Sequence, residues 1–132
     1  MEKTFFIFTF ILILIIAILH ELALNFFLYW KFWWFDILMH FLGGLWIGLI
    51  SLWFYFLSGY VKYTKKRITF IFVLSSVSVL VVGIAWELFE LLVEFDFSSE
   101  YLFDTISDLI LDILGALTAS IILINIDRKE IL

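Results

Sequence analysis

The stretch ITFIFVLSSVSVLVVGIAW (residues 68–86) contains no charged residue and no proline, and most of its side chains are aliphatic or aromatic. A helix needs about 20 mainly apolar residues to cross the hydrocarbon core of a bilayer. This stretch nearly reaches that length, and apolar residues continue to about residue 95 despite three glutamates. It therefore predicts a membrane-spanning helix over about residues 68–95.

The rest of the chain has the same character. Of its 132 residues, 65% are hydrophobic and 16% are charged, with no proline and no cysteine. A soluble domain is about 45–50% apolar and about 25% charged, so this composition indicates a membrane protein. Without cysteine, disulfides and thiolate metal sites are excluded. We expect a single transmembrane domain over residues 1–132, an all-α integral membrane four-helix bundle with helices over about 4–24, 35–60, 68–95 and 104–126.

The basic residues predict the orientation, because cytoplasmic loops carry an excess of lysine and arginine. With four spans, both termini and the connection between spans two and three share one side. That side holds Lys3, Lys62, Lys65, Lys66, Arg67, Arg128 and Lys129. The opposite side holds Lys31 alone, within an aromatic cluster (residues 29–34) that is typical of a membrane interface. We expect cytoplasmic N- and C-termini in the cell membrane, contact with membrane lipid, and no nucleic-acid partner.

Acidic and histidine residues interrupt the outer ends of all four spans, at a similar depth. They are His20, Asp36, His40, Glu87, Glu90, Asp104, Asp108 and Asp112. An ionisable group in a membrane helix is costly and by default indicates a functional site. Two alternatives are structural: Asp104 would cap the fourth helix, and the deeper residues would form a hydrogen-bonded network without chemistry.

Small residues extend the same helix faces toward the cytoplasmic side. Gly44 and Gly48 follow Asp36 and His40 at a spacing of four, which favours close helix packing. On the third span, a seam through Ser76, Leu80 and Gly83 leads to the glutamates. On the fourth span, Gly115 follows the aspartates. We therefore expect the polar side chains to point into the bundle, with helix packing at Gly44, Gly48, Gly83 and Gly115.

Carboxylates that face one another without basic partners repel, and protons or bound cations must relieve the repulsion. Carboxylates with an imidazole suit a divalent metal such as Zn, Mn or Fe. We predict Asp36, His40, Asp104 and Asp108 as metal ligands, with the identity of the ion open. Glu87 and Glu90 are the predicted catalytic residues. His20 and Asp112 are predicted to support the site. Asp112 either reaches the metal or is protonated and hydrogen-bonded to a neighbour such as His40 or Glu87, and we favour the protonated state.

Three motifs carry a resemblance to a known family: FDILMHFLGG (35–44), WELFELL (86–92) and FDTISDLILDILGALTA (103–119). In this order they resemble the motifs of YjdF-like inner-membrane proteins, and more distantly those of VanZ-like glycopeptide-resistance proteins. The resemblance covers about residues 30–120. It implies a small helical membrane protein, lends no mechanism, and marks as motif residues Asp36, His40, Glu87, Glu90, Asp104 and Asp108.

Three functions remain open at this point. The first is a metal-supported site near the outer leaflet that acts on a lipid or cell-envelope substrate. The second is a non-catalytic module that binds an envelope component or a partner protein. The third is a proton- or cation-coupled transporter, for which the series Asp104, Asp108 and Asp112 would suit a relay. The cytoplasmic half offers few polar residues to continue such a relay.

Overall fold

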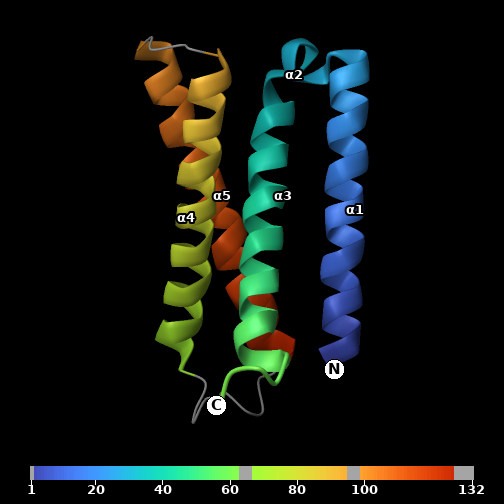
Figure 1. Cartoon of the computed structure of the whole chain (residues 1–132), viewed down its shortest axis with the longest axis vertical. Coiled ribbons are helices and arrows are strands. Elements are labelled where there is room, and N and C mark those ends of the chain that lie inside the picture. The colour runs from blue at the N-terminus through green and yellow to red at the C-terminus, as the bar shows by residue number, and fades with distance from the viewer. Residues whose placement is uncertain (1, 63–66, 95–98, 127–132) are drawn as a thin grey trace.

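The computed structural model describes residues 2–62, 67–94 and 99–126, and these residues form helices joined by short connections. In chain order the elements are α1 (Glu2–Phe26), α2 (Leu28–Lys31), α3 (Trp33–Leu52), the π-helical turn η1 (Trp53–Leu57), α4 (Ile68–Glu94) and α5 (Ser99–Ile126). The four long helices run side by side along one axis (Figure 1). No strand occurs in the residues listed above, which confirms the predicted all-α class.

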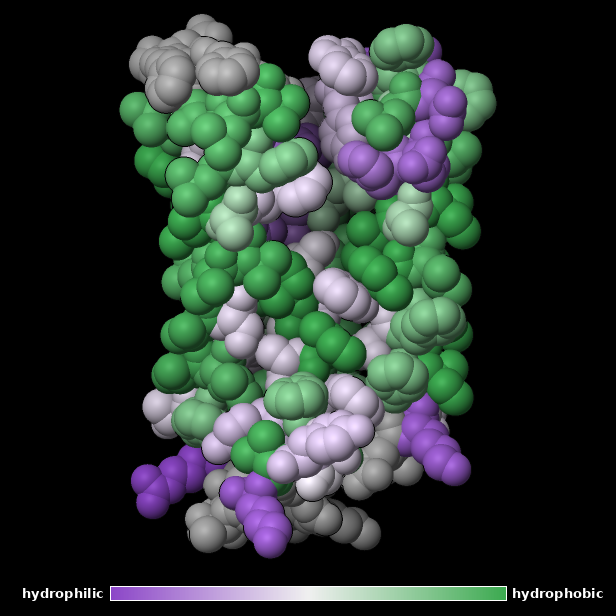
Figure 2. Space-filling model, viewed as in Figure 1, coloured by the Kyte–Doolittle hydropathy of each residue, from purple (hydrophilic) through white to green (hydrophobic). Residues whose placement is uncertain are grey.

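Four segments are long and apolar enough to cross a membrane: Lys3–Phe26, Trp33–Leu57, Ile68–Val93 and Tyr101–Ile126. They coincide with the four predicted spans. Figure 2 shows a broad hydrophobic band around the middle of the molecule, with the most hydrophilic side chains gathered toward its two ends. This distribution is the one that a bilayer requires, because apolar side chains face the lipid and polar ones face the interfaces.

Two boundaries differ from the sequence-based expectation. The last helix begins at Ser99, so Asp104 lies inside α5 and does not cap its start. The short helix α2 was not expected. It follows Phe27, whose φ of 59° places a non-glycine residue in the left-handed region. This turn folds α2 back over the end of the bundle, between α1 and α3 (Figure 1).

Helix α3 is the centre of the bundle. It packs most extensively against α5, and it also contacts α4 and α1. The buried apolar core lies in the half of the bundle nearer the N-terminus: Phe5, Leu12, Leu45, Leu49, Leu52, Phe56, Leu57, Ile71, Ala119 and Leu123. The half of the bundle nearer α2 contains the buried acidic residues, Glu87, Asp108 and Asp112.

Close approach of α3 and α5 depends on glycine. A Cβ added to Gly44 would lie 2.6 Å from Cα of Asp112 and overlap its carbonyl oxygen. One added to Gly48 would lie 2.8 Å from Cβ of Ala119, and one added to Gly115 would lie 2.8 Å from the carbonyl carbon of Gly44. The two backbones thus touch along this seam, as expected for small residues at helix interfaces in membranes.

The buried face of α4 differs by one residue from the predicted seam. It follows a strict spacing of four, through Ile71, Ser75, Val79, Gly83 and Glu87. Ser75 takes the place that was expected for Ser76. Its hydroxyl lies 2.6 Å from the hydroxyl of Ser120 on α5, and both are fully buried.

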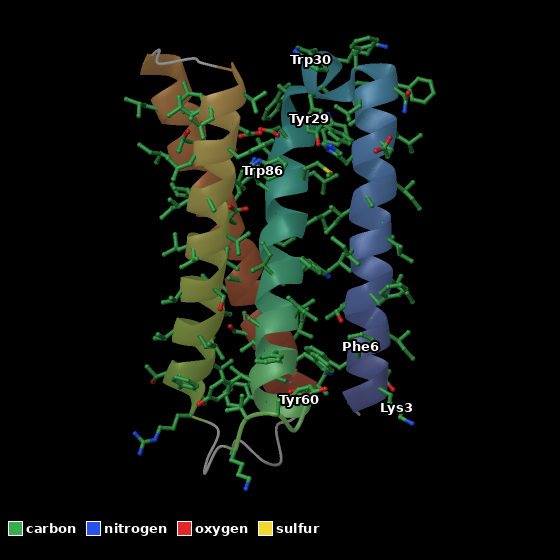
Figure 3. All side chains as sticks on the ribbon, in the orientation of Figure 1. Lys3, Phe6, Tyr29, Trp30, Tyr60 and Trp86 are labelled. Atoms are coloured by element: carbon green, nitrogen blue, oxygen red, sulfur yellow. The ribbon has the colours of Figure 1, made fainter. Side chains whose placement is uncertain are left out.

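Hydrogen bonds join helix α1 to α3 in one half of the bundle and to α2 at the other end. Nε1 of Trp46 donates a hydrogen bond to the carbonyl of Thr9 (3.0 Å). At the other end, Nδ1 of His20 lies 2.9 Å from the hydroxyl of Tyr29 in α2. Figure 3 shows Tyr29 and Trp30 at the α2 end, and Lys3 and Phe6 at the opposite end near the start of α1.

Candidate metal centre

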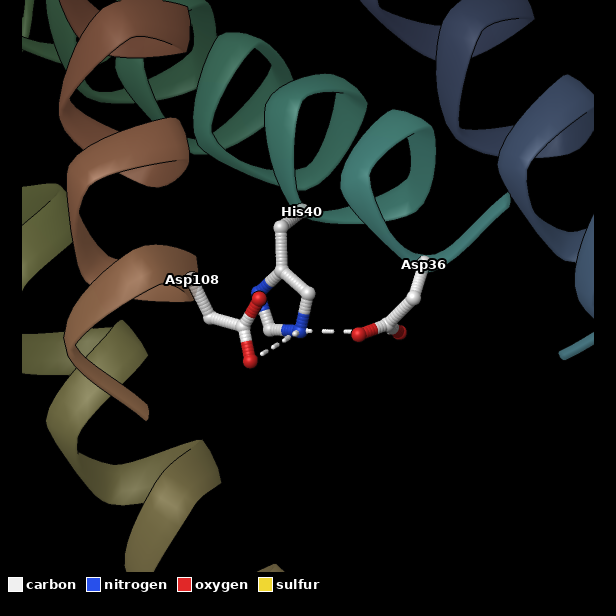
Figure 4. Close-up of side chains that lie close together, drawn as sticks. All are labelled: Asp36, His40 and Asp108. Atoms are coloured by element: carbon white, nitrogen blue, oxygen red, sulfur yellow. Dashed lines mark ion pairs between the residues drawn. The ribbon is translucent and has the colours of Figure 1, made fainter. Parts of the chain in front are cut away.

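The ring of His40 lies between three carboxylates, and its two nitrogens face different partners. Nε2 lies 3.9 Å from Oδ1 of Asp36 on the same helix and 3.7 Å from Oδ2 of Asp108 on α5 (Figure 4). Nδ1 lies 3.4 Å from Oδ1 of Asp112. Asp36 and His40 are four residues apart on α3, and Asp108 and Asp112 are four apart on α5, so each pair shares one helix face.

One ligand atom from each of Asp36, His40 and Asp108 lies within 4.8 Å of the other two. Ligands about 2.1 Å from a tetrahedral zinc ion are about 3.4 Å apart, from the bond lengths and angle. The observed separations at His40 exceed that value by a few tenths of an ångström, which side-chain rotation can close. After such rotation the three residues could hold a divalent ion between α3 and α5.

The site is closed toward the bundle interior and open toward its end. Asp108 and Asp112 are 4% and 6% exposed, whereas the side chain of Asp36 retains 37% of its accessible surface. In Figure 2, hydrophilic atoms lie deep between the two halves of the bundle, just below its α2 end. A polar molecule can therefore approach from the membrane interface, on the side of Asp36.

The charges in the site do not balance within the described residues. All ion pairs that Asp36, Asp108 and Asp112 make there are with His40, and no lysine or arginine takes part. One imidazole, even when protonated, neutralises one carboxylate of the three. The arrangement requires bound protons or an additional cation.

Glu87 approaches the site from α4 and is 6% exposed. Its Oε2 accepts a hydrogen bond from Oγ1 of Thr105 (2.8 Å), and its backbone carbonyl accepts one from the hydroxyl of Tyr101 (2.7 Å). Oε1 is buried and has no hydrogen-bond partner within the described part of the chain. A buried carboxylate oxygen without a donor is unusual, and a catalytic role, a bound ion or a bound water would each explain it.

Gly83 is the reason that α4 can lie against Asp112. A Cβ added to Gly83 would be 2.6 Å from Oδ2 of Asp112 and 3.1 Å from Cδ2 of Leu109. The absence of a side chain leaves room for the carboxylate between α4 and α5. Gly44 therefore packs against the backbone of Asp112, and Gly83 packs against its carboxylate.

The other predicted residues lie around this centre without joining it. Asp104 is exposed and is outside the three-residue donor group, although it is within electrostatic range of Asp36 and Asp108. Glu90 is half-buried and interacts electrostatically with Glu87, His40 and Asp36. His20 pairs with Tyr29. The roles assigned to these residues stay predictions.

Two residues near the site were not predicted as part of it. Thr105, the donor to Glu87, occupies the second position of the D-T-x-x-D motif, so its place in the motif was a usable signal. Tyr29 was assigned to the aromatic belt. Burial and the nearby carboxylates of Asp36 and Glu90 raise the pKa of Tyr29 to about 12. The phenol thus keeps its proton at neutral pH and is available as a donor to His20.

Comparison with known proteins gives a family and no closer relative. Neither the curated proteins nor the solved structures contain a match to the chain. Nothing found supports the expected distant link to VanZ-like proteins. A family model matches residues 3–129, nearly the whole chain, and so shows the family. The chain belongs to the family described as "Predicted membrane protein (DUF2238)".

Proposed function

We propose that Asp36, His40 and Asp108 bind a divalent metal ion, and that the site acts on a lipid or cell-envelope substrate at the membrane interface. The observation that carries the proposal is the division of partners around His40. Two carboxylates face Nε2, where an ion would bind, and a third faces Nδ1. Metal-binding histidines almost always direct their second nitrogen to a carboxylate, carbonyl or water in this way.

The position of Asp112 fixes the ring for metal binding. A proton on Nδ1 directed at Asp112 leaves the lone pair of Nε2 free for the ion. On this basis Asp112 is an ionised acceptor and a positioning residue. This proposal differs from the protonated Asp112 favoured from sequence, in which a proton donated by Asp112 to Nδ1 would place the ring proton on Nε2.

The proposed chemistry follows from the remaining groups. A bound divalent ion would supply a Lewis acid for a phosphoryl or ester oxygen. One carboxylate oxygen of Glu87 is held by Thr105, and the other has no hydrogen-bond partner among the described residues, so it is free to accept a proton as a general base. Glu90 is half-buried one turn further along α4, nearer the open end, and would contact the substrate.

Location supports a membrane substrate. The site lies below the end of the bundle that carries exposed Trp30 and Trp33, which are 73% and 81% exposed and suited to the headgroup region. By the distribution of lysine and arginine, we place this end at the outer leaflet of the cell membrane, with both termini cytoplasmic. The ordered motifs further support a YjdF-like member of the family.

Transport is less well supported. Beyond Asp112, the buried polar pair between α4 and α5 consists of the hydroxyls of Ser75 and Ser120, and both also contact the carbonyl of Ala116. Along this seam of the described chain no buried ionisable side chain continues the aspartate series toward the termini. A relay through α5 would therefore end at Asp112.

Metal analysis of the purified protein tests the proposal, with Asp108→Asn and Asp104→Asn as a matched pair. Both variants remove one negative charge from the same face of α5, but the donor group includes only Asp108. We expect stoichiometric Zn²⁺ or Mn²⁺ in the wild type, about 10-fold weaker binding in Asp108→Asn and little change in Asp104→Asn. Absence of metal under all loading conditions, or equal losses in the two variants, would contradict the site.

Catalysis is separated from simple binding by Glu87→Gln. This variant keeps the acceptor for Thr105 and should keep the metal, but it lacks a base. Proteoliposomes made from a total membrane lipid extract are incubated with each protein, and the lipids are then compared by mass spectrometry. A product formed by the wild type and not by Glu87→Gln supports catalysis. Unchanged lipids with metal-loaded wild type favour the non-catalytic binding module.

A further inference from the structure

At the end of the bundle opposite the candidate metal centre, an open cavity lies between the start of α1 and the turn η1. Its volume is about 300 Å³, and it is lined by Lys3, Phe6, Ile7, Trp53, Leu57 and Ser58. This volume is at the lower limit for small-molecule sites in proteins. Figure 3 shows Lys3 and Phe6 on α1 at this end, beside the chain that carries Tyr60. The cavity shares no residue with the candidate metal centre.

The cavity has an apolar wall and a polar mouth. Phe6 and Ile7 are 42% and 55% exposed, and the ring of Phe6 contacts that of Trp53 in a tilted arrangement, with ring centroids 4.8 Å apart. At the rim, the Lys3 ammonium makes no ion pair with any described carboxylate. Ser58 also lines the cavity, and its hydroxyl donates to the carbonyl of Phe54 and accepts a hydrogen bond from the backbone N–H of Tyr60 (3.3 Å). This layout matches a lipid, whose acyl chain and headgroup meet at the membrane interface.

The backbone of η1 shapes this wall. Residues Trp53–Leu57 form a π-helical turn, a rare distortion that is frequent at functional sites. Nε1 of Trp53 is buried and has no hydrogen-bond partner among the described residues. Trp53 is one of the residues that line the cavity, so this turn places a buried indole donor in the cavity wall.

The charge at this end selects among lipids. Lys62 and Arg67 are exposed near the same end as Lys3. Anionic lipids attract such basic residues, at about a fivefold gain in affinity for each lysine near the surface. A zwitterionic headgroup would gain much less from Lys3.

We infer that this cavity binds an anionic phospholipid, with the phosphate beside Lys3 and Ser58 and an acyl chain along Phe6 and Ile7. The lipid would occupy the space between the start of α1 and η1. It would thereby add to the contacts of Phe5 and Phe6 that hold α1 against this end of the bundle.

Native mass spectrometry tests this inference on the full chain. The protein is taken from nanodiscs with equal amounts of phosphatidylglycerol and phosphatidylcholine, and the two lipid adducts are counted. We expect the wild type to retain phosphatidylglycerol preferentially, and Lys3→Gln to reduce that preference about fivefold. Lys62→Gln is the matched control, because it removes a cation at the same end that does not line the cavity.

The contrary results are equally definite. Equal retention of the two lipids by the wild type, or loss of all adducts, would overturn the inference. So would an equal effect of Lys3→Gln and Lys62→Gln, since that would indicate general surface charge. Helical content by circular dichroism verifies that each variant is folded. As a second readout, Ile7→Trp places a larger side chain in the apolar part of the cavity without changing the charge. This variant should lower the retention of phosphatidylglycerol.

Discussion

Gly44 of α3 and Asp112 of α5 are in backbone contact, so that a Cβ on Gly44 would lie 2.6 Å from Cα of Asp112. The same aspartate faces Nδ1 of His40, one turn before Gly44 on α3. An aspartate side chain is short, and its carboxylate can reach the imidazole because the two helices touch. Helix packing and the geometry of the site thus depend on one contact.

Gly44→Ala should therefore disturb both stability and metal binding. The added methyl group meets backbone atoms, which cannot rotate away, and overpacking of this kind costs about 1–3 kcal/mol. Gly43→Ala is the control, because nothing lies within 4 Å of a Cβ at Gly43. We expect a lower unfolding temperature in detergent for Gly44→Ala and an unchanged or slightly higher one for Gly43→Ala. Equal unfolding temperatures in the two variants would show that α3 and α5 are not in backbone contact.

The role of Asp112 can be tested by comparing an acceptor with an apolar side chain. Asp112→Asn retains an oxygen that accepts the Nδ1 proton, whereas Asp112→Leu removes it. We expect Zn²⁺ affinity, measured by titration calorimetry, to fall by no more than about threefold in Asp112→Asn and by about 10–100-fold in Asp112→Leu. If Asp112→Asn lowers the Zn²⁺ affinity as much as Asp108→Asn does, Asp112 is itself a ligand. The two nitrogens of His40 would then have been assigned in the wrong order.

Thr105 links α5 to the buried Glu87, and its removal should be costly. Thr105→Val has nearly the same shape but leaves Oε2 of Glu87 without its donor, in addition to the unpartnered Oε1. A buried group that loses its partner costs about 1–3 kcal/mol. We expect Thr105→Val to lower the free energy of unfolding by that amount and Thr105→Ser to be close to wild type. Indistinguishable stabilities would mean that water replaces the threonine hydroxyl.

The sequence predicts the spans well because their signal is length and apolar composition, which a bilayer selects directly. It does not predict α2, since four residues are too few to show a periodic pattern. The predicted seam of α4 is correct at Gly83, but before Gly83 it is displaced by one residue, since Ser75 and Val79 are buried in place of Ser76 and Leu80. The observed face repeats every four residues from Ile71 to Glu87.

The candidate site, too, is predicted in part from the sequence. That Asp36, His40 and Asp108 lie near one another follows from their depth in antiparallel spans, which the sequence contains. Which ring nitrogen faces which carboxylate depends on side-chain rotamers and on the approach permitted by Gly44 and Gly83. The exposure of Asp104 likewise depends on the rotation of α5 about its own axis. Residues four apart do not point in the same direction around a helix of 3.6 residues per turn, so the spacing alone does not determine which aspartates face the bundle.

The membrane orientation is tested with single-cysteine variants, because the natural chain has no cysteine to mask them. Lys31 and Lys62 are exposed and lie at opposite ends of the bundle. By the excess of basic residues at the end that includes Lys62, we expect Lys31→Cys to react with a membrane-impermeant maleimide in intact cells. Lys62→Cys should react only after the membrane is permeabilised. The reverse pattern would place the candidate metal centre at the cytoplasmic face, and its substrate would then be a lipid of the inner leaflet. Reaction of both cysteines in intact cells would contradict a four-span arrangement, since these two positions are separated by a single span, Trp33–Leu57.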